Sequence, residues 1–121
     1  MQEIERLLSE YTIKTNIDIK DIIDFHYKFE RIHPFEDGNG RIGRLIMFKE
    51  CLKNGIIPFI IDVGHQAFYY RGLKNYENQK GFLIDTCLSC QDEYEAILKD
   101  YIDGASIDLN EAYSILEKVV S

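Results

Sequence analysis

Apolar residues in this chain recur every three or four positions along most of its length, and this spacing restricts the fold more than any other feature. The first segment has such a stripe, made of Ile4, Leu7, Leu8 and Tyr11. This spacing matches one face of an α-helix, whereas alternating β-branched runs are scarce and there are only two prolines. We therefore expect an all-α fold.

The second helix is expected to begin after Asp18, because an aspartate N-cap accepts hydrogen bonds from the first turn. The residue before a proline is disfavoured in helical geometry, so Pro34 predicts the end of this helix. The apolar face between these points consists of Ile19, Ile22, Ile23, His26, Phe29 and either Ile32 or His33.

After the glycines at 38 and 40, residues 41–52 are apolar around most of a helix circumference. This pattern predicts a helix buried at the centre of the domain, with a stop at residues 53–55. The segment IIPFIIDVG at 56–64 suits a short buried strand or a packed loop, since Pro58 lacks a backbone donor. Further helical patterns cover about 65–77, 80–102 and 107–120.

With 121 residues, 45% of them hydrophobic, the chain has enough material for one compact domain and too little for two. We expect a core at 1–103 and a C-terminal helical tail at 104–121, because Gly104 interrupts the pattern.

The charge and composition of the chain limit the kinds of partner that it is expected to bind. The net charge of -7 opposes nucleic-acid binding, which needs clustered positive charge. No apolar run approaches the roughly 20 residues of a membrane span, and the start is acidic and amphipathic, so we expect no membrane contact and a cytoplasmic location.

The three cysteines are Cys51, Cys87 and Cys90, an odd number that fits a reducing compartment. CLSC has the spacing of a metal or redox pair, but only Cys51 and His65 remain to complete a zinc site. We therefore interpret these cysteines as small apolar residues on a helix.

Residues 33–44, HPFEDGNGRIGR, concentrate chemically special side chains between two predicted helices. A helix N-terminus presents unpaired N–H groups and the positive end of the helix dipole, and Gly38 and Gly40 allow a close approach of backbone to an anion. Arg41 and Arg44 are three apart, so both guanidinium groups can reach the same anion. The combination predicts a polyphosphate site.

Two further residues complete a reaction centre. A carboxylate beside bound phosphate needs a cation between them, and Mg²⁺ commonly takes one protein carboxylate together with phosphate oxygens, which suits Asp37. Glu36 should point elsewhere. Histidine accepts a proton near neutral pH, so His33 is the natural general base. Each residue alone fits an ordinary glycine-rich turn, but together they are the parts that phosphoryl or nucleotidyl transfer needs.

The stretch HPFEDGNGRIGR fills every fixed position of the Fic signature H-P-F-x-[DE]-G-N-G-R-x-x-R, and IIDFHYKFERIHPF and FYYRGL resemble the flanking helices of that family. The resemblance covers about residues 1–103. Fic domains, part of the Fido superfamily, are all-α protein adenylyltransferases, which are nucleotidyltransferases. They mostly move AMP from ATP to a Tyr, Thr or Ser hydroxyl of a target protein and release pyrophosphate.

By this resemblance, His33 would deprotonate the target hydroxyl and Asp37 would bind the magnesium ion that bridges the α- and β-phosphates of ATP. The resemblance also implies an anion hole made of Gly38, Asn39 and Gly40, with the Asn39 side chain near the α-phosphate.

Six positions have supporting roles in the same comparison. Arg41 and Arg44 would hold the outer phosphates, while Pro34 and Phe35 would shape and anchor the loop. Tyr69 and Tyr70 align with a tyrosine pair that would line the adenine side, and packing of both rings in the core is the alternative.

Gly40 separates chemistries within the family. The related Doc kinases carry Lys at this position, so Gly40 favours nucleotidyl transfer, while a phosphocholine-transferring relative leaves the donor open. Relatives usually carry a β-hairpin flap before the helix that resembles MQEIERLLSEY, so the chain is expected to be a fragment or to lack this target clamp. A truncated Fic core that binds a nucleotide or a partner without turnover is therefore a rival.

The family's inhibitory pattern [ST]-x-x-x-E-[GN] is not found in the sequence. Inhibition would then come from preceding sequence or from a partner antitoxin. The predicted helix at 107–120 carries Glu111 and Glu117, but a solvated amphipathic helix is the simpler interpretation.

Overall fold

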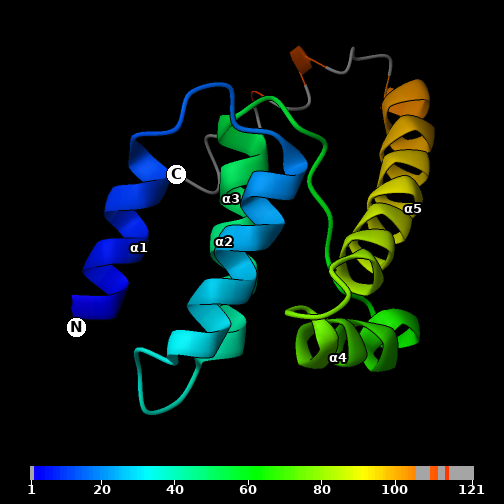
Figure 1. Cartoon of the computed structure of the whole chain (residues 1–121). Helices are drawn as coiled ribbons and strands as arrows, with labels where there is room; N and C mark the ends of the chain where they lie inside the picture. Colours follow the sequence, from blue (N-terminus) through cyan, green and yellow to red (C-terminus); the bar gives the residue numbers. More distant parts are fainter. Residues whose placement is uncertain (1, 106–109, 112–113, 115–121) are drawn as a thin grey trace.

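A computed structural model describes residues 2–105, 110–111 and 114. Its elements are α1 (Gln2–Thr12), α2 (Ile19–Ile32), α3 (Asn39–Lys53), the 3-10 helix η1 (Val63–His65), α4 (Gln66–Asn75) and α5 (Gly81–Ala105) (Figure 1). No strand occurs among these residues, and the all-α prediction is confirmed. The predicted helix at 107–120 falls largely outside them. Since α5 continues through Gly104, the predicted boundary after residue 103 does not coincide with the end of a helix.

The helices pack in two groups joined by α2. Helix α2 contacts α1, α3 and α5, and α4 packs along α5. In Figure 1 the first three helices lie side by side, and α4 lies near the end of the molecule where the chain turns from α2 to α3. The residues of the motif are therefore carried by the best-packed pair in the first half of the chain.

Both ends of α2 follow from its sequence. Asp18 accepts a hydrogen bond from the N–H of Asp21 (2.9 Å), and the Asp21 carboxylate accepts one from the N–H of Asp18 (3.0 Å), which forms a capping box. At the other end His33 adopts a left-handed conformation (φ 56°), and its N–H donates to the carbonyl of Phe29 (3.2 Å). The predicted start and stop are confirmed.

The main hydrophobic core joins α2, α3, α4 and α5, and a smaller cluster of Leu7, Phe25 and Phe29 joins α1 to α2. All three cysteines are free and buried in the main core. Burial raises the pKa of Cys51 to about 12 and that of Cys90 to about 11. These values keep the thiols protonated, which confirms their interpretation as small apolar core residues.

Helix α3 is less enclosed than its composition predicted. Its buried residues are Asn39, Gly43, Met47, Cys51 and Leu52, whereas Leu45 is 60% exposed. The apolar circumference was a correct observation, but part of it is exposed. The prediction of a buried central helix holds for the face that carries these five buried residues.

The ambiguous segment at 56–64 is a packed loop that leads into η1. Pro58 and Phe59 are buried, and the Gln91 side chain donates to the carbonyl of Ile57 (2.9 Å). This side-chain hydrogen bond satisfies a backbone acceptor that a strand would have paired with another strand. In the described parts of the chain, no helix is long and apolar enough to span a membrane.

A buried histidine, His26, lies at the junction of three helices and is 1% exposed. Its Nδ1 lies 3.1 Å from the carbonyl oxygen of Gly43 on α3, and its Nε2 lies 2.5 Å from the hydroxyl of Tyr69 on α4. Burial lowers the pKa of His26 to about 4, although the hydrogen bond to Gly43 opposes the shift. The imidazole is therefore neutral and structural.

The depressed pKa of His26 predicts a pH-dependent stability. Between pH 6.5 and 4 the unfolded chain binds a proton at this residue while the folded chain does not, so the free energy of unfolding falls as the pH is lowered. At pH 5 the expected loss is about 2 kcal/mol relative to pH 7. Urea denaturation of wild type and His26→Gln at both pH values measures this loss.

The His26→Gln variant controls for other groups whose protonation changes between pH 7 and pH 5. Glu30 faces His26 and has a raised pKa, so it contributes with the opposite sign in both proteins, while burial raises the pKa of Tyr69 and keeps its hydroxyl neutral. The pH dependence should be shallower in His26→Gln than in wild type. Identical pH dependence in the two proteins would show that His26 does not titrate as described.

Candidate active site

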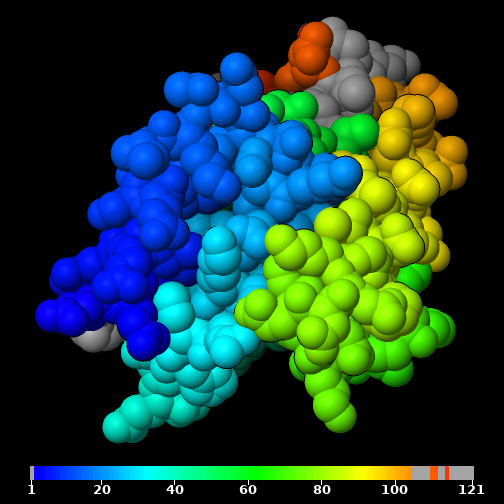
Figure 2. All heavy atoms as spheres, in the orientation of Figure 1, coloured from blue at the N-terminus to red at the C-terminus, as the bar shows by residue number. Residues whose placement is uncertain are grey.

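The motif occupies one end of the α2–α3 pair. His33 ends α2, residues 34–38 form the turn, and Asn39 begins α3. Figure 2 shows the cyan residues of this turn projecting from one end of the molecule. The turn needs left-handed backbone at both ends, at His33 (φ 56°) and at Gly38 (φ 75°). Glycine takes this conformation without strain, which explains Gly38 at the start of α3.

The Asn39 side chain holds the turn closed. Its Oδ1 accepts from the N–H of Phe35 (2.9 Å), and its Nδ2 donates to the carbonyl of Phe35 (2.7 Å). Asn39 is only 3% exposed, so both hydrogen bonds are shielded from water. The resemblance implied an Asn39 side chain near the α-phosphate. In the structure both groups of the side-chain amide are hydrogen-bonded to the backbone of Phe35, and the backbone N–H of Asn39 lies at the start of α3.

The first turn of α3 presents unpaired donors. The first helical hydrogen bond runs from the N–H of Ile42 to the carbonyl of Gly38 (3.0 Å), and no side chain caps Gly38. The N–H groups of Asn39, Gly40 and Arg41 precede that bond and have no acceptor within the helix. This end of the helix is therefore suited to an anion.

The Arg44 guanidinium lies back along α3 over this first turn. A Cβ atom placed on Gly40 would be 3.0 Å from Arg44 Nη1. Arg41 is exposed on the first turn of the helix. One of the two predicted cations, Arg44, thus lies over the first turn of α3, and the lack of a side chain at Gly40 leaves room for it.

The predicted base and metal ligand are both accessible. His33 is exposed, with its Nδ1 3.4 Å from the carbonyl oxygen of Glu30, and Asp37 is exposed in the turn. A single carboxylate next to an anion site fits a magnesium ion that takes its other ligands from phosphates and water. A group of three with metal-ligand spacing lies away from the turn and consists of Asp62, His65 and Glu93. Asp62 Oδ1 already accepts from both the backbone N–H and Nδ1 of His65.

Pro34 and Phe35 have unequal roles in the turn. Pro34 is half-buried and follows the left-handed residue, while Phe35 is 46% exposed. The Phe35 ring lies 6.5 Å from that of Phe29, measured between centroids. The loop is therefore anchored through the Phe35 backbone more than through its side chain.

The neighbouring residues Tyr69 and Tyr70 on α4 lie in different environments. Tyr69 is 1% exposed and hydrogen-bonded to His26, so it is a core residue, and its prediction as an adenine contact is corrected. Tyr70 is 54% exposed, and its predicted role remains a prediction. Periodicity could not distinguish these neighbours, because both belong to an aromatic-rich helix.

Glu30 was not identified from the sequence. Its Oε1 is buried and has no hydrogen-bond partner among the described residues. It packs against Gly43, where an added Cβ would overlap it, and lies 4.0 Å from Nε2 of His26. Burial raises the pKa of Glu30, while the charges of Arg44 and His33 oppose the rise. The sequence signal that could have identified Glu30 is its position four residues after His26, which belongs to the apolar face of the helix.

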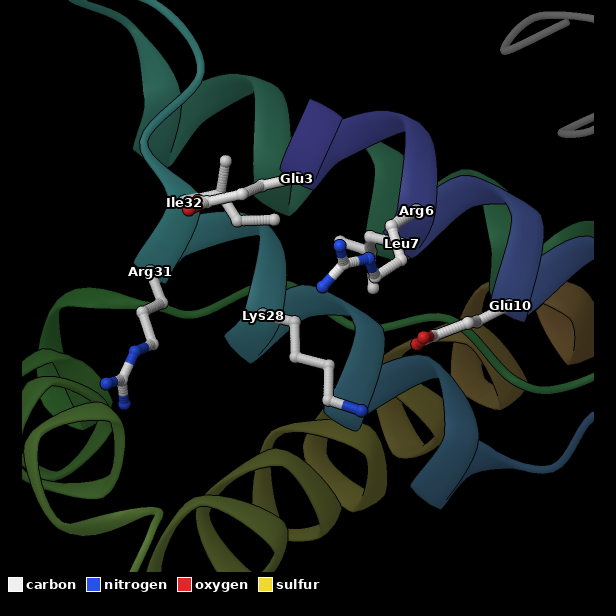
Figure 3. Close-up of a pocket in the computed structure, with 7 residues that line it drawn as sticks. All are labelled: Glu3, Arg6, Leu7, Glu10, Lys28, Arg31 and Ile32. Atoms are coloured by element: carbon white, nitrogen blue, oxygen red, sulfur yellow. The ribbon is translucent and has the colours of Figure 1, made fainter. Parts of the chain in front are cut away.

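Two of the cavities among the described residues lie beside α2 or α3. The one in Figure 3 measures about 350 Å³ and lies between α1 and α2, lined by Glu3, Arg6, Leu7, Glu10, Lys28, Arg31 and Ile32. Its lining includes no residue of the motif. The other measures about 410 Å³ and is mostly apolar, lined by Arg44, Leu45, Met47, Phe48, Phe59, Ile60 and Ile61.

Fold and site together define a helical domain in which a glycine-containing turn leads into the first turn of α3. Residues 1–51, which include the whole motif, match the sequence profile of the Fic/DOC family, so the resemblance to this family is confirmed over that region. Similar proteins include the protein adenylyltransferase Fic of Drosophila erecta, 40% identical over 74 residues, and that of Drosophila melanogaster, 39% identical over the same length. In both cases the match covers 61% of this chain but only 15% of the relative.

The Asn39 clamp leads to a prediction about the turn. Asn39→Ala removes both hydrogen bonds to Phe35, so we expect a loss of about 1–3 kcal/mol in stability and faster hydrogen exchange at the Phe35 amide. Asn54→Ala is the matched control, because the Asn54 side chain donates to the carbonyl of Glu50 (2.8 Å) at the other end of α3. The clamp is contradicted if Phe35 exchange is equally slow in wild type and Asn39→Ala.

Proposed function

We propose that this chain forms the core of a magnesium-dependent protein adenylyltransferase of the Fic type. It would transfer AMP from ATP to a Tyr, Thr or Ser hydroxyl of a target protein and release pyrophosphate. The observation that carries the proposal is the start of α3, where N–H groups without an acceptor in the helix meet the Arg44 guanidinium, with the exposed His33 at the other end of the turn that leads into α3.

The proposed reaction assigns a role to each group. His33 accepts the proton of the target hydroxyl, and the oxygen then attacks the α-phosphorus. The bond from that phosphorus to the oxygen leading to the β-phosphate breaks, and pyrophosphate leaves. The N–H groups of the first turn stabilise the charge on the α-phosphate, and Arg41 and Arg44 stabilise the leaving group. A magnesium ion on Asp37 would supply further neutralisation of phosphate charge.

Gly40 supports nucleotidyl transfer over kinase chemistry. A side chain at this position would meet the guanidinium of Arg44, so the residue at 40 and the placement of Arg44 are coupled. A lysine there, as in the Doc kinases, would bring a third cation to the same turn. With glycine at position 40, Arg44 is the cation that lies over the first turn of α3 at this position.

The proposed function also implies particular partners and a cellular location. A target protein with an accessible hydroxyl is the required partner, and an antitoxin or inhibitory partner would regulate the enzyme. The reduced, buried cysteines and the net charge of -7 support a cytoplasmic location without nucleic-acid binding.

Transfer of label from ATP tests the proposal. Wild type and His33 variants are incubated with lysate, magnesium and ATP labelled at the α- or the γ-phosphate. We expect α-label on protein with wild type and at least a 100-fold lower rate without the base. His33→Asn is the preferred variant, because asparagine tolerates the left-handed backbone that His33 adopts, whereas His33→Ala adds strain.

The alternatives give different results in the same assay. The γ-label on protein would indicate a kinase, and measurable ATP binding without any label would indicate a non-catalytic binding module. Equal labelling by wild type and by His33→Asn, with ATP binding unchanged, would show that His33 is not the base.

A further inference from the structure

Four polar groups form a closed path around the junction of α2, α3 and α4. It starts at the carbonyl of Gly43, passes through the His26 ring to the Tyr69 hydroxyl, and returns to α3 at Arg44. His26 and Tyr69 are each 1% exposed, so water does not compete with these contacts. The path begins and ends on neighbouring residues of the helix that carries the anion site.

The direction of the hydrogen bonds along this path is determined by its first member. A carbonyl oxygen can only accept, so Nδ1 of His26 must carry the proton. Because the buried ring is neutral, Nε2 is an acceptor, and the Tyr69 hydroxyl must donate to it. The lone pairs of the Tyr69 oxygen are then left to accept from another donor.

Arg44 is the donor next to that oxygen. Its guanidinium carbon lies 6.0 Å from the centroid of the Tyr69 ring. Burial raises the pKa of Tyr69, and a hydrogen bond and the positive charge of Arg44 oppose the rise. A guanidinium group only donates, so it matches the free acceptor of Tyr69. The partly buried carboxylate of Glu30 attracts the same cation.

We propose that Tyr69, oriented by His26, is a positioning residue that holds the Arg44 guanidinium over the first turn of α3. Arginine has several rotatable bonds, and the contact with Gly40 shows where its head must lie to face the unpaired N–H groups. A fixed acceptor behind the head reduces the entropy lost when an anion binds. That the anion is the outer part of ATP rests on the proposed function.

Tyr69→Phe tests the positioning directly, because it removes the hydroxyl and keeps the ring. In the free protein, the NMR order parameter of the Arg44 Nε–H group should fall relative to wild type. Affinity for Mg-ATP should fall about tenfold, whereas affinity for AMP, which lacks the outer phosphates, should stay the same. In an Arg44→Ala background the Tyr69→Phe change should cost no further ATP affinity, since Tyr69 acts through Arg44.

Tyr76→Phe is the matched control. Tyr76 is 4% exposed, and its hydroxyl donates to Asp24 (2.9 Å) on α2, so the variant also loses a buried tyrosine hydrogen bond. We expect it to change neither Arg44 order nor the ratio of ATP to AMP affinity. The proposal is overturned if Arg44 is equally ordered in wild type and Tyr69→Phe, or if Tyr76→Phe produces the same losses.

The two readouts separate this proposal from the proposed function. If wild type binds no ATP but Arg44 loses order in Tyr69→Phe, the proposed function fails and the positioning contact stands. If wild type labels protein with AMP and Arg44 keeps its order in Tyr69→Phe, the positioning contact fails and the proposed function stands.

Discussion

The close approach of α2 and α3 at Gly43 is the constraint on which the rest of the structure depends. An added Cβ at this position would overlap the Glu30 carboxylate and lie 3.1 Å from the Phe29 ring, so a larger residue would have to displace side chains of α2. The carbonyl of the same residue lies 3.1 Å from Nδ1 of His26, and His26 in turn contacts Tyr69 on α4. Gly43 therefore lies where contacts between three helices meet.

The geometry of the turn follows from that approach. Because α2 and α3 lie so near each other, residues 33–38 must reverse the chain sharply. The left-handed conformations of His33 and Gly38 produce the reversal, and the Asn39 clamp fixes it. The same reversal leaves the first N–H groups of α3 unpaired. Packing of the helices and the placement of the first turn of α3 at one end of the pair are thus two results of one arrangement.

Much of this could be predicted from the sequence, because the signals are local. The capping box at Asp18, the stop before Pro34 and the turn glycines depend on near neighbours in the chain. The exposure of Leu45 and the burial of Tyr69 could not be predicted, since periodicity identifies a face but not what covers it. Glu30 was missed for the same reason, as its burial depends on a glycine in the next helix.

Two histidines, one within α2 and one just past its end, show how environment divides their roles. His26 is enclosed, and its pKa of about 4 keeps it neutral at any pH where an ordinary imidazole titrates. Its single proton is held by the Gly43 carbonyl, so the hydrogen bonds through Tyr69 keep one direction. His33 lies past the end of the helix and is exposed to any substrate. A ligand can therefore reach His33 without disturbing the buried contacts of His26.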